Sequence, residues 1–188
     1  MSPTLPRPWN DVAAPCAVHD DWSYDEAFSR NRGLISPSIQ QKLRTSRVAI
    51  AGMGGVGALH LMTLARLGVG KFTIADPDCY EVTNFNRHYG ANLSTLGRNK
   101  AEAMAEAALS VNPDLDLRVL PCAVDESNID DFLAGADLHV DGVDFFAIGV
   151  RRLLFREAAA RGLWSVTAGP IGFSAAWLAF DPAGMSFD

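Results

Sequence analysis

Apolar residues along this chain follow two alternating patterns, which are short continuous runs and longer stretches with helical spacing. The short runs predict strands at residues 47–51, 71–75, 115–120, 138–140, 164–168 and 175–180. The helical spacing predicts helices at residues 58–67, 98–111, 127–133 and 146–161. Strands that alternate with helices predict an α/β fold, with a mostly parallel sheet that carries helices on both faces.

The first 46 residues follow a different pattern. Residues 1–21 contain four prolines and predict a flexible N-terminal arm without regular structure. A short helix is expected within residues 22–33, and a second over 36–44, where Ser36 has the position of an N-cap and a proline follows it. We therefore expect one domain over residues 22–188, which begins with a short helical segment.

Composition and charge exclude some classes of function. Of the 188 residues, 48% are hydrophobic and 20% are charged, as in an ordinary soluble domain. The formal net charge is −6, which argues against a general nucleic-acid binder because phosphate contacts need a basic surface. A local basic pocket remains compatible with this charge.

The chain also offers no clear sign of a membrane or an export route. Residues 163–180 are apolar and about long enough to cross a bilayer, which takes roughly 20 residues. Gly169, Pro170 and Gly172 interrupt them and favour two buried strands instead. The N-terminus has prolines and acids where a signal peptide needs an apolar run, and the three cysteines are scattered. We expect a cytoplasmic protein.

A glycine-rich turn follows the first predicted buried strand. The sequence VAIAGMGGVG contains G-x-G-x-x-G at Gly52, Gly54 and Gly57, with Gly55 between them. Such glycines allow a tight bend and a close approach of phosphate to the backbone at a helix N-terminus. Asp76 ends the second predicted strand, where a carboxylate can accept both ribose hydroxyl protons. The pattern is typical of a Rossmann-like nucleotide site.

The segment after Asp76 favours ATP over a redox dinucleotide as the ligand. This segment contains four polar residues: Asn84, Arg87, Arg98 and Lys100. A redox dinucleotide would not need them, because the turn already binds its diphosphate. Arginine and lysine suit triphosphate oxygens and stabilise charge on a phosphate undergoing displacement. Each alone could be a solvated surface residue, but together they indicate a triphosphate site.

Several motifs in this order resemble the ThiF/MoeB/HesA family, the bacterial relatives of ubiquitin-activating enzymes. They are GMGGVG at 52–57, ADPD at 75–78, TNFNRH at 83–88, GRNKAE at 97–102 and VDGVD at 140–144. The glycine motif alone is weak evidence, but the complete series with its spacing is specific. The resemblance extends over residues 24–180, which is most of the chain.

The resemblance implies an ATP-dependent adenylyltransferase that activates a carboxylate and releases diphosphate. The substrate would be the C-terminal carboxylate of a ubiquitin-like, sulfur-carrier or peptide partner, and ATP and Mg²⁺ would be the cofactors. The implied nucleotide-binding residues are Gly52, Gly54, Gly55, Gly57, Asp76, Asp78, Asn84, Arg87 and Lys100. The implied catalytic residues are Arg30, Arg87, Lys100 and Asp144, with Asp144 on the magnesium ion. Asp141 fits a strand-end residue that shapes the loop before Asp144.

The family also carries an arginine before the first strand that reaches the active site of a partner subunit. The corresponding segment here is Phe28-Ser29-Arg30-Asn31, which makes Arg30 the candidate and Arg32 the alternative. An ordinary surface arginine is the competing interpretation. If Arg30 acts in the partner's site, the protein is a homodimer with two composite sites.

The chain departs from the family in three places. Phe145 stands where an asparagine often follows the metal-associated aspartate, and His88 where a glutamine often follows the arginine of N-x-x-R. The chain also ends just after the last predicted strand, so the C-terminal part of the family fold is expected to be missing. No C-x-x-C pair is present, so no zinc is predicted. Cys79 and Cys122 are interpreted as small packing residues.

Two other classes of function remain open at this point. An NAD(P)-dependent Rossmann oxidoreductase would explain the glycine turn and Asp76, but it leaves Asn84, Arg87 and Lys100 without a role. A non-catalytic nucleotide-binding or scaffold domain is compatible with the early end of the chain. The adenylated carboxylate could also belong to a modified tRNA nucleoside, although the net acidity disfavours it.

Overall fold

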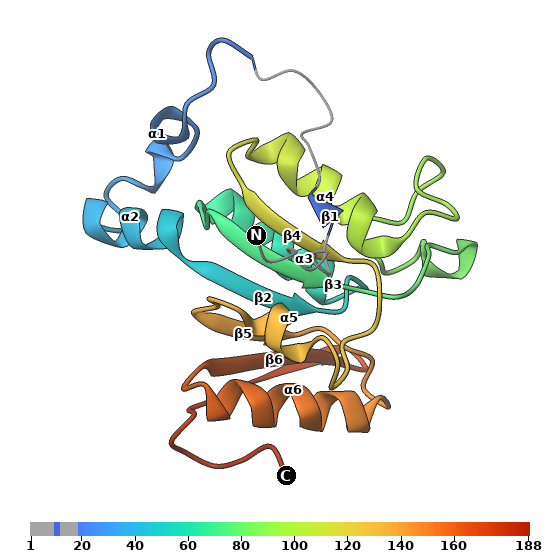
Figure 1. The fold of residues 1–188 in the computed structure, drawn as a ribbon. Helices are drawn as coiled ribbons and strands as arrows, with labels where there is room; N and C mark the ends of the chain where they lie inside the picture. The colour runs from blue at the N-terminus through green and yellow to red at the C-terminus, as the bar shows by residue number, and fades with distance from the viewer. Residues whose placement is uncertain (1–9, 12–18) are drawn as a thin grey trace, which may run out of the picture.

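The computed structural model describes residues 10–11 and 19–188, which are organised around one seven-stranded sheet (Figure 1). The strand order is β1-β4-β3-β2-β5-β6-β7. The strands are β1 (Asn10–Asp11), β2 (Arg47–Ala51), β3 (Lys71–Ala75), β4 (Asp116–Leu120), β5 (Leu138–Asp141), β6 (Trp164–Ile171) and β7 (Ser174–Phe180).

The five central strands are parallel, and only the two edge strands run antiparallel to their neighbours. Strand β2 lies in the middle and pairs with β3 on one side and β5 on the other. Strands β2, β3 and β4 follow one another towards one edge of the sheet. Strand β5 then lies on the other side of β2, and β6 and β7 continue towards the opposite edge. In open α/β sheets, ligands bind at the carboxyl ends of the strands where the order reverses, which here is between β2 and β5.

Helices cover both faces of the sheet, as the sequence predicts. One buried cluster joins β2 and β3 to α3 (Gly57–Leu67) and α4 (Lys100–Val111). A second cluster, on the other face, joins the sheet to α5 (Ile129–Leu133) and α6 (Ile148–Ala160). The remaining helices are α1 (Tyr24–Ala27), α2 (Pro37–Thr45) and the 3-10 helices η1 (Ser29–Asn31) and η2 (Val82–Asn84).

Local signals in the sequence fix the ends of these helices. Ser36 Oγ accepts the backbone N–H of Ile39 and so caps α2, and Asn99 does the same for α4 through the N–H of Glu102. Gly68 ends α3 in the left-handed conformation, at φ 99°. Helices α4, α5 and α6 begin two residues later than expected, and β6 ends three residues later than expected.

The N-terminal segment differs from the sequence expectation in two respects. Residues 10–11 form strand β1 on the β4 edge, within the segment expected to lack regular structure, while residues 1–9 and 12–18 lie outside the described part. The helix expected over residues 22–33 is split into α1 and η1. Within the described residues, no helix is both long and apolar enough to span a bilayer.

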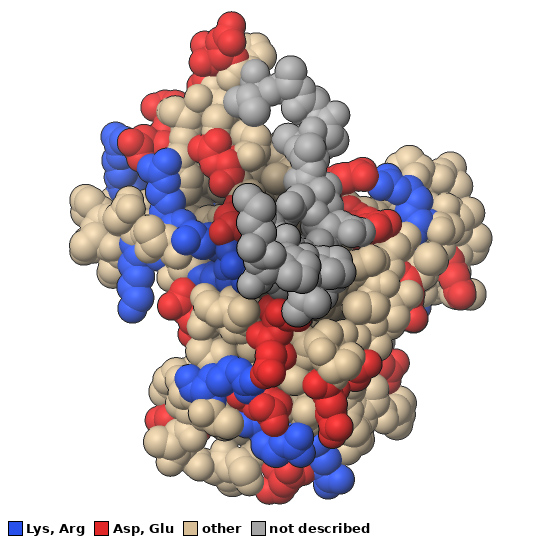
Figure 2. All heavy atoms as spheres, in the orientation of Figure 1, with Lys and Arg blue, Asp and Glu red and all other residues tan. Residues whose placement is uncertain are grey.

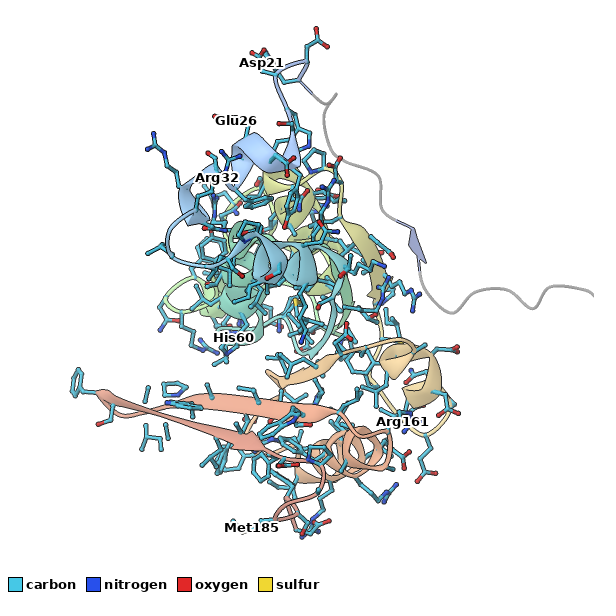
Figure 3. All side chains as sticks on the ribbon, turned by 90° about the vertical axis from the view of Figure 1, so that its left-hand side faces the viewer. Asp21, Glu26, Arg32, His60, Arg161 and Met185 are labelled. Atoms are coloured by element: carbon cyan, nitrogen blue, oxygen red, sulfur yellow. The ribbon has the colours of Figure 1, made fainter. Side chains whose placement is uncertain are left out.

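The expectation of two buried strands near the C-terminus is wrong, since only Ser165 of β6 is buried and β7 has no buried residue. The difference is greatest for β7. Its side chains are exposed almost throughout, and Trp177 is 72% accessible. Strand β5 pairs with β6 only as far as Thr167, so residues 168–171 and their β7 partners project beyond it by about 13 Å. Figure 3 shows this hairpin extending past the rest of the sheet. The apolar sequence predicted burial, but the hairpin leaves the layer that would cover it.

Candidate active site

The glycine turn lies at the carboxyl end of β2, at the point where the strand order reverses. Gly52 has a φ of 86°, and a Cβ there would lie 2.3 Å from the carbonyl oxygen of Gly142. A Cβ on Gly57 would lie 1.8 Å from the oxygen of Gly52. These glycines thus allow the turn, the start of α3 and the loop after β5 to pack backbone against backbone.

The middle of the turn is covered by the segment that carries the N-x-x-R-H sequence. A Cβ on Gly54 would contact the His88 ring, and one on Gly55 would lie 3.1 Å from the carbonyl oxygen of Arg87. The turn leads into α3, whose first N–H groups and helix dipole favour an anion. The glycine turn and the helix start expected of a phosphate cradle are both present, and the His88 ring lies against the turn.

Asp76 follows β3 and points back to the turn. Its Oδ2 accepts the backbone N–H of Met53 at 2.6 Å, and its Oδ1 accepts that of Asp78 at 2.8 Å. Only 5% of the residue is exposed, and this burial raises the pKa of the carboxyl group against the opposing effect of the two hydrogen bonds. Each oxygen retains further acceptor capacity, as binding of a ribose diol requires.

Lys100 is the first residue of α4 and lies beside the same strand end. Its Nζ is 2.9 Å from Asp78 Oδ2, and its side chain is 8% exposed whereas that of Asp78 is 66% exposed. Arg98, two residues earlier, instead pairs with Glu106 on the surface. The structure thus brings Lys100 and Asp78 to the site and leaves Arg98, just before α4, paired with Glu106 of that helix.

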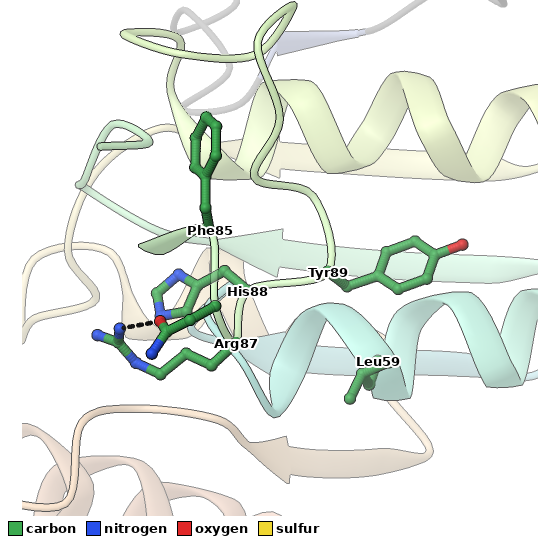
Figure 4. A pocket seen from close by; sticks show the side chains of 6 residues that line it. Leu59, Phe85, Arg87, His88 and Tyr89 are labelled. Atoms are coloured by element: carbon green, nitrogen blue, oxygen red, sulfur yellow. Dashed lines mark hydrogen bonds between the residues drawn. The ribbon is translucent and has the colours of Figure 1, made fainter. Parts of the chain in front are cut away.

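The loop of Asn84 and Arg87 is held together by its own hydrogen bonds. Asn84 is buried, and its Oδ1 accepts the N–H of Glu81 while its backbone oxygen accepts those of Arg87 and His88. The Arg87 guanidinium is exposed and donates to Thr83 O and Asn86 Oδ1. Arg87 and His88 lie side by side in a shallow pocket next to α3 (Figure 4), lined by Leu59, Phe85, Asn86, Arg87, His88 and Tyr89.

Asp144 lies on the loop that follows β5, two residues after the glycine that packs on the turn. It is exposed, and its Oδ1 accepts the N–H of Phe146. Asp141, at the end of β5, is buried and forms an ion pair at 2.8 Å with Arg151 of α6. Asp141 also accepts the N–H of Val143, so it shapes this loop as the sequence analysis expected.

Arg151 is a residue that the sequence analysis missed. Besides Asp141 it contacts Thr167 Oγ1 of β6 and the backbone oxygen of Phe145, and its guanidinium lies 5.6 Å from the Phe145 ring centre. It thereby ties the loop of Asp144 to β5 and β6. A signal was available, because buried Leu154 and Phe155 follow at helical spacing and place Arg151 on the core face of α6.

Tyr80 is a second buried polar residue near the turn that had not been singled out. Its hydroxyl group donates to the backbone oxygen of Met53 at 3.4 Å. Burial, followed by the charge of Asp76, raises the pKa of Tyr80 to about 12. Cys79 and Cys122 are free and exposed, so their interpretation as packing residues is wrong.

Arg30 lies far from this site within one subunit. It is exposed and belongs to η1, whose Asn31 donates to the backbone oxygen of Leu67 at the C-terminal end of α3. The glycine turn lies at the opposite end of this 11-residue helix, which is about 16 Å long. The structure therefore does not bring Arg30, or the nearby alternative Arg32, to the other candidate residues.

The described residues contain no group of three or more His, Cys, Asp or Glu side chains placed to hold a metal ion. Magnesium commonly uses only one or two carboxylates together with substrate phosphates and waters. Asp144 is an exposed carboxylate beside the phosphate cradle, so its donor chemistry fits such a shared site.

Comparison with known proteins gives consistent matches. The chain is 36% identical over 137 residues to the tRNA threonylcarbamoyladenosine dehydratase of Bacillus subtilis, covering 72% of this chain and 53% of that protein. It is 36% identical over 112 residues to the SAMP-activating enzyme E1 of Haloferax volcanii, covering 60% and 42%. It thus spans about half the length of these curated relatives.

Solved structures agree with the sequence relatives. The Escherichia coli tRNA N6-threonylcarbamoyladenosine dehydratase in complex with ATP superposes with a TM-score of 0.74 at 27% identity, covering 83% of this chain and 65% of that one. The model of the ThiF family matches residues 28–188, which include every strand of the parallel core and all site residues described above. The chain belongs to the ThiF family.

Proposed function

We propose that this protein is an ATP-dependent adenylyltransferase that converts a carboxylate into an acyl-adenylate and releases diphosphate. The observation that carries the proposal is the convergence of Asp76, Lys100 and the loop of Arg87 on the glycine turn at the reversal of strand order. A relative with the same fold has been solved with ATP bound. A redox dinucleotide would leave Lys100 and Arg87 without a role.

In the proposed reaction a carboxylate oxygen attacks the α-phosphorus of ATP. A new oxygen–phosphorus bond forms as the bond from the α-phosphorus to the diphosphate oxygen breaks, and the diphosphate leaves with its electron pair. The nucleophile is already ionised, so the reaction needs positioning and charge neutralisation more than a general base. Asp76 would hold the ribose, and Lys100, Arg87 and Asn84 would contact the phosphates.

Asp144 would hold the magnesium ion that accompanies ATP in this proposal. A bound Mg²⁺ supplies neutralisation of the phosphate charge. The protein's own part is to fix the carboxylate: the N–H of Phe146 orients Oδ1, and the ion pair of Arg151 with Asp141 anchors the loop. No zinc site is part of the proposal.

The proposed acceptor is the C-terminal carboxylate of a ubiquitin-like protein or a peptide. One relative is named as the activating enzyme of SAMP, while others are named as tRNA dehydratases. The formal charge of −6 favours the protein or peptide acceptor over a nucleic acid. On the face seen in Figure 2, basic side chains are interspersed with acidic ones and form no broad patch.

We further propose a cytoplasmic homodimer in which Arg30 completes the site of the partner subunit. The distance of Arg30 from its own glycine turn supports this arrangement, because an active-site role would then require a second copy. The two exposed free cysteines Cys79 and Cys122 are compatible with a reducing compartment.

The test is exchange of labelled diphosphate into ATP, measured with candidate carrier proteins and peptides and, separately, with tRNA. We expect exchange that depends on a protein or peptide carboxylate and on Mg²⁺. Asp144→Ala should abolish it, while Asp181→Ala, a change in a loop beyond β7, should leave it intact. Exchange that survives in Asp144→Ala would contradict the magnesium assignment, and exchange with tRNA alone would identify the acceptor as a nucleoside.

A ligand-binding measurement separates the adenylyltransferase from the oxidoreductase. Ligands stabilise the state that binds them, so ATP with Mg²⁺ should raise the melting temperature whereas NAD⁺ and NADP⁺ should not. Stabilisation by a nicotinamide dinucleotide alone would contradict the proposal. Stabilisation by ATP without exchange for any acceptor would favour a non-catalytic nucleotide-binding domain.

A further inference from the structure

His88 lies directly on the phosphate cradle. A Cβ added to Gly54 would lie 3.4 Å from its Cε1 and 3.7 Å from its Nε2, so the imidazole ring rests against the middle of the turn. The backbone of the same residue is fixed by Asn84, whose carbonyl oxygen accepts the N–H of His88 at 2.9 Å. The ring is therefore held where the phosphates of a bound nucleotide would approach the turn.

The His88 ring is also short of polar partners. Its Nδ1 is buried and has no hydrogen-bond partner among the described residues. A buried polar atom without a partner is costly, and such atoms in native structures often await a ligand or water. The ring packs at a steep angle against that of Tyr80, with 6.4 Å between the centroids, and no hydrogen bond joins the two side chains.

The charges around His88 are mainly positive. Lys100 of α4 and Arg87 of its own loop both lower the pKa of His88, after the larger effect of burial, and Asp78 beyond β3 raises it. Tyr80 is neutral at physiological pH because its pKa lies near 12. The turn itself, residues 52–57, carries no titratable side chain. In the free protein, burial and these two cations therefore disfavour the charged form of the imidazole.

We propose that His88 is a phosphate-binding residue that takes up a proton when the nucleotide binds. This rests on the proposed function, and it assigns to the site a residue and a proton linkage beyond the phosphate contacts proposed above. The polyanion brings negative charge next to Lys100 and Arg87, which removes their repulsion of an imidazolium. A protonated His88 then donates a charge-assisted hydrogen bond to a phosphate oxygen.

Proton uptake by His88 on binding determines how nucleotide affinity depends on pH. The pKa of His88 is below its ordinary value in the free protein and rises in the complex, so the complex binds more protons than the free protein. Nucleotide affinity must then increase as the pH falls from 8 to 6. With one proton involved, the contribution of His88 cannot exceed about tenfold in affinity per pH unit.

The experiment measures ATP–Mg²⁺ binding by calorimetry at pH 7 in buffers of different ionisation enthalpy, which gives the number of protons taken up. The wild-type protein is compared with His88→Gln, because glutamine keeps a hydrogen-bond donor but does not titrate. Protonation of ATP itself contributes equally to both proteins and cancels in the difference. Adenosine, which lacks phosphates, is the ligand control.

We expect greater proton uptake by the wild-type protein than by His88→Gln with ATP, and no difference with adenosine. Nuclear magnetic resonance of the wild-type imidazole groups gives a second readout that needs no variant to fold: ATP should raise the pKa of one histidine. Equal proton uptake in both proteins, with no histidine shifted by ATP, would overturn the role of His88 alone. Absence of ATP binding to either protein would overturn the proposed function as well.

Discussion

Lys100 and Arg98 carry the same charge two residues apart, yet the structure gives them different surroundings. Lys100 is buried against Asp78 at the carboxyl end of β3, whereas Arg98 is half exposed and pairs with Glu106. The start of α4 explains the difference, because Asn99 caps the helix between them and turns the chain. Equal charge in the sequence therefore does not mean an equal part in the site.

This difference gives a prediction with a built-in control. Lys100→Ala should reduce diphosphate exchange by about 100-fold, the usual loss when one donor to developing negative charge is removed. Arg98→Ala should change it by less than about twofold, because its partner Glu106 lies on the surface outside the site and such a pair contributes little to stability. Exchange rates of the two variants at saturating ATP provide the measurement. Similar losses in both would mean that Arg98 also contacts the nucleotide.

Strand β5 carries two polar residues on the face that α6 covers. His139 is fully buried; its Nδ1 lies 3.0 Å from Ser165 Oγ, and its ring packs edge-on against Phe155. Two residues later Asp141 pairs with Arg151. A single strand thus contributes a neutral polar contact at its centre and a charged anchor at the end that meets the site.

The burial of His139 makes a predictable contribution to acid sensitivity. Burial lowers its pKa from 6.5 to about 4, despite the opposing charge of Asp141. A depressed pKa favours folding above pH 6.5, and this contribution is lost progressively as the pH falls from 6.5 to 4, in total roughly 3 kcal/mol. Urea unfolding between pH 7 and 4 should show a shallower loss of stability for His139→Leu than for wild type. If both proteins lost stability equally over this pH range, the lowered pKa of His139 would be contradicted.

The elements also show how far a sequence can be interpreted. The limits of β2 and β3 were predicted to the residue, because a continuous apolar run between a polar start and a Gly or Asp end has few alternatives. Residues 174–180 of β7 have an equally apolar sequence but are exposed, since burial depends on what the rest of the chain places above a strand. Hydrophobic pattern predicts the element, and tertiary structure decides its environment.

The residues of the candidate site could likewise be predicted from the sequence only in part. Asp76 was singled out because it follows a predicted strand, and Lys100 because it is a cation in the segment after Asp76; the structure places both beside the turn. Arg151 was missed because its partner Asp141 lies on another element, ten residues earlier. Arg30 has no described contact that could test its role, because that role depends on a second chain.

Helix α3 separates the glycine turn from the segment that carries Arg30. The glycine turn lies at its start, while η1 with Arg30 packs at its end, on the side of the sheet where α1 and α2 lie (Figure 1). One subunit therefore cannot place Arg30 on its own nucleotide. In the composite site proposed above, the Arg30 that acts on a nucleotide comes from the other copy, and such a site can be tested by mixing inactive variants.

The Arg30→Ala and Lys100→Ala variants are mixed in equal amounts and refolded together, so that mixed dimers can form. Each variant alone should be nearly inactive, but a mixed dimer has one intact site, formed by Lys100 of one copy and Arg30 of the other. Random pairing should then restore about a quarter of wild-type exchange. Sedimentation analysis confirms that dimers form. If a mixture that is shown to contain dimers regains no exchange activity, the role of Arg30 in the partner site is contradicted.

The β6–β7 hairpin has a consequence for how this chain behaves in solution. Residues 164–180 contain no charged side chain, and the outer edge of β7 pairs with no strand among the described residues. Natural proteins usually protect such edges with lysine, proline or a covering segment, because an open, uncharged edge is a template for further strands. Where nothing covers it, this hairpin is the part of the molecule at which aggregation is expected to begin.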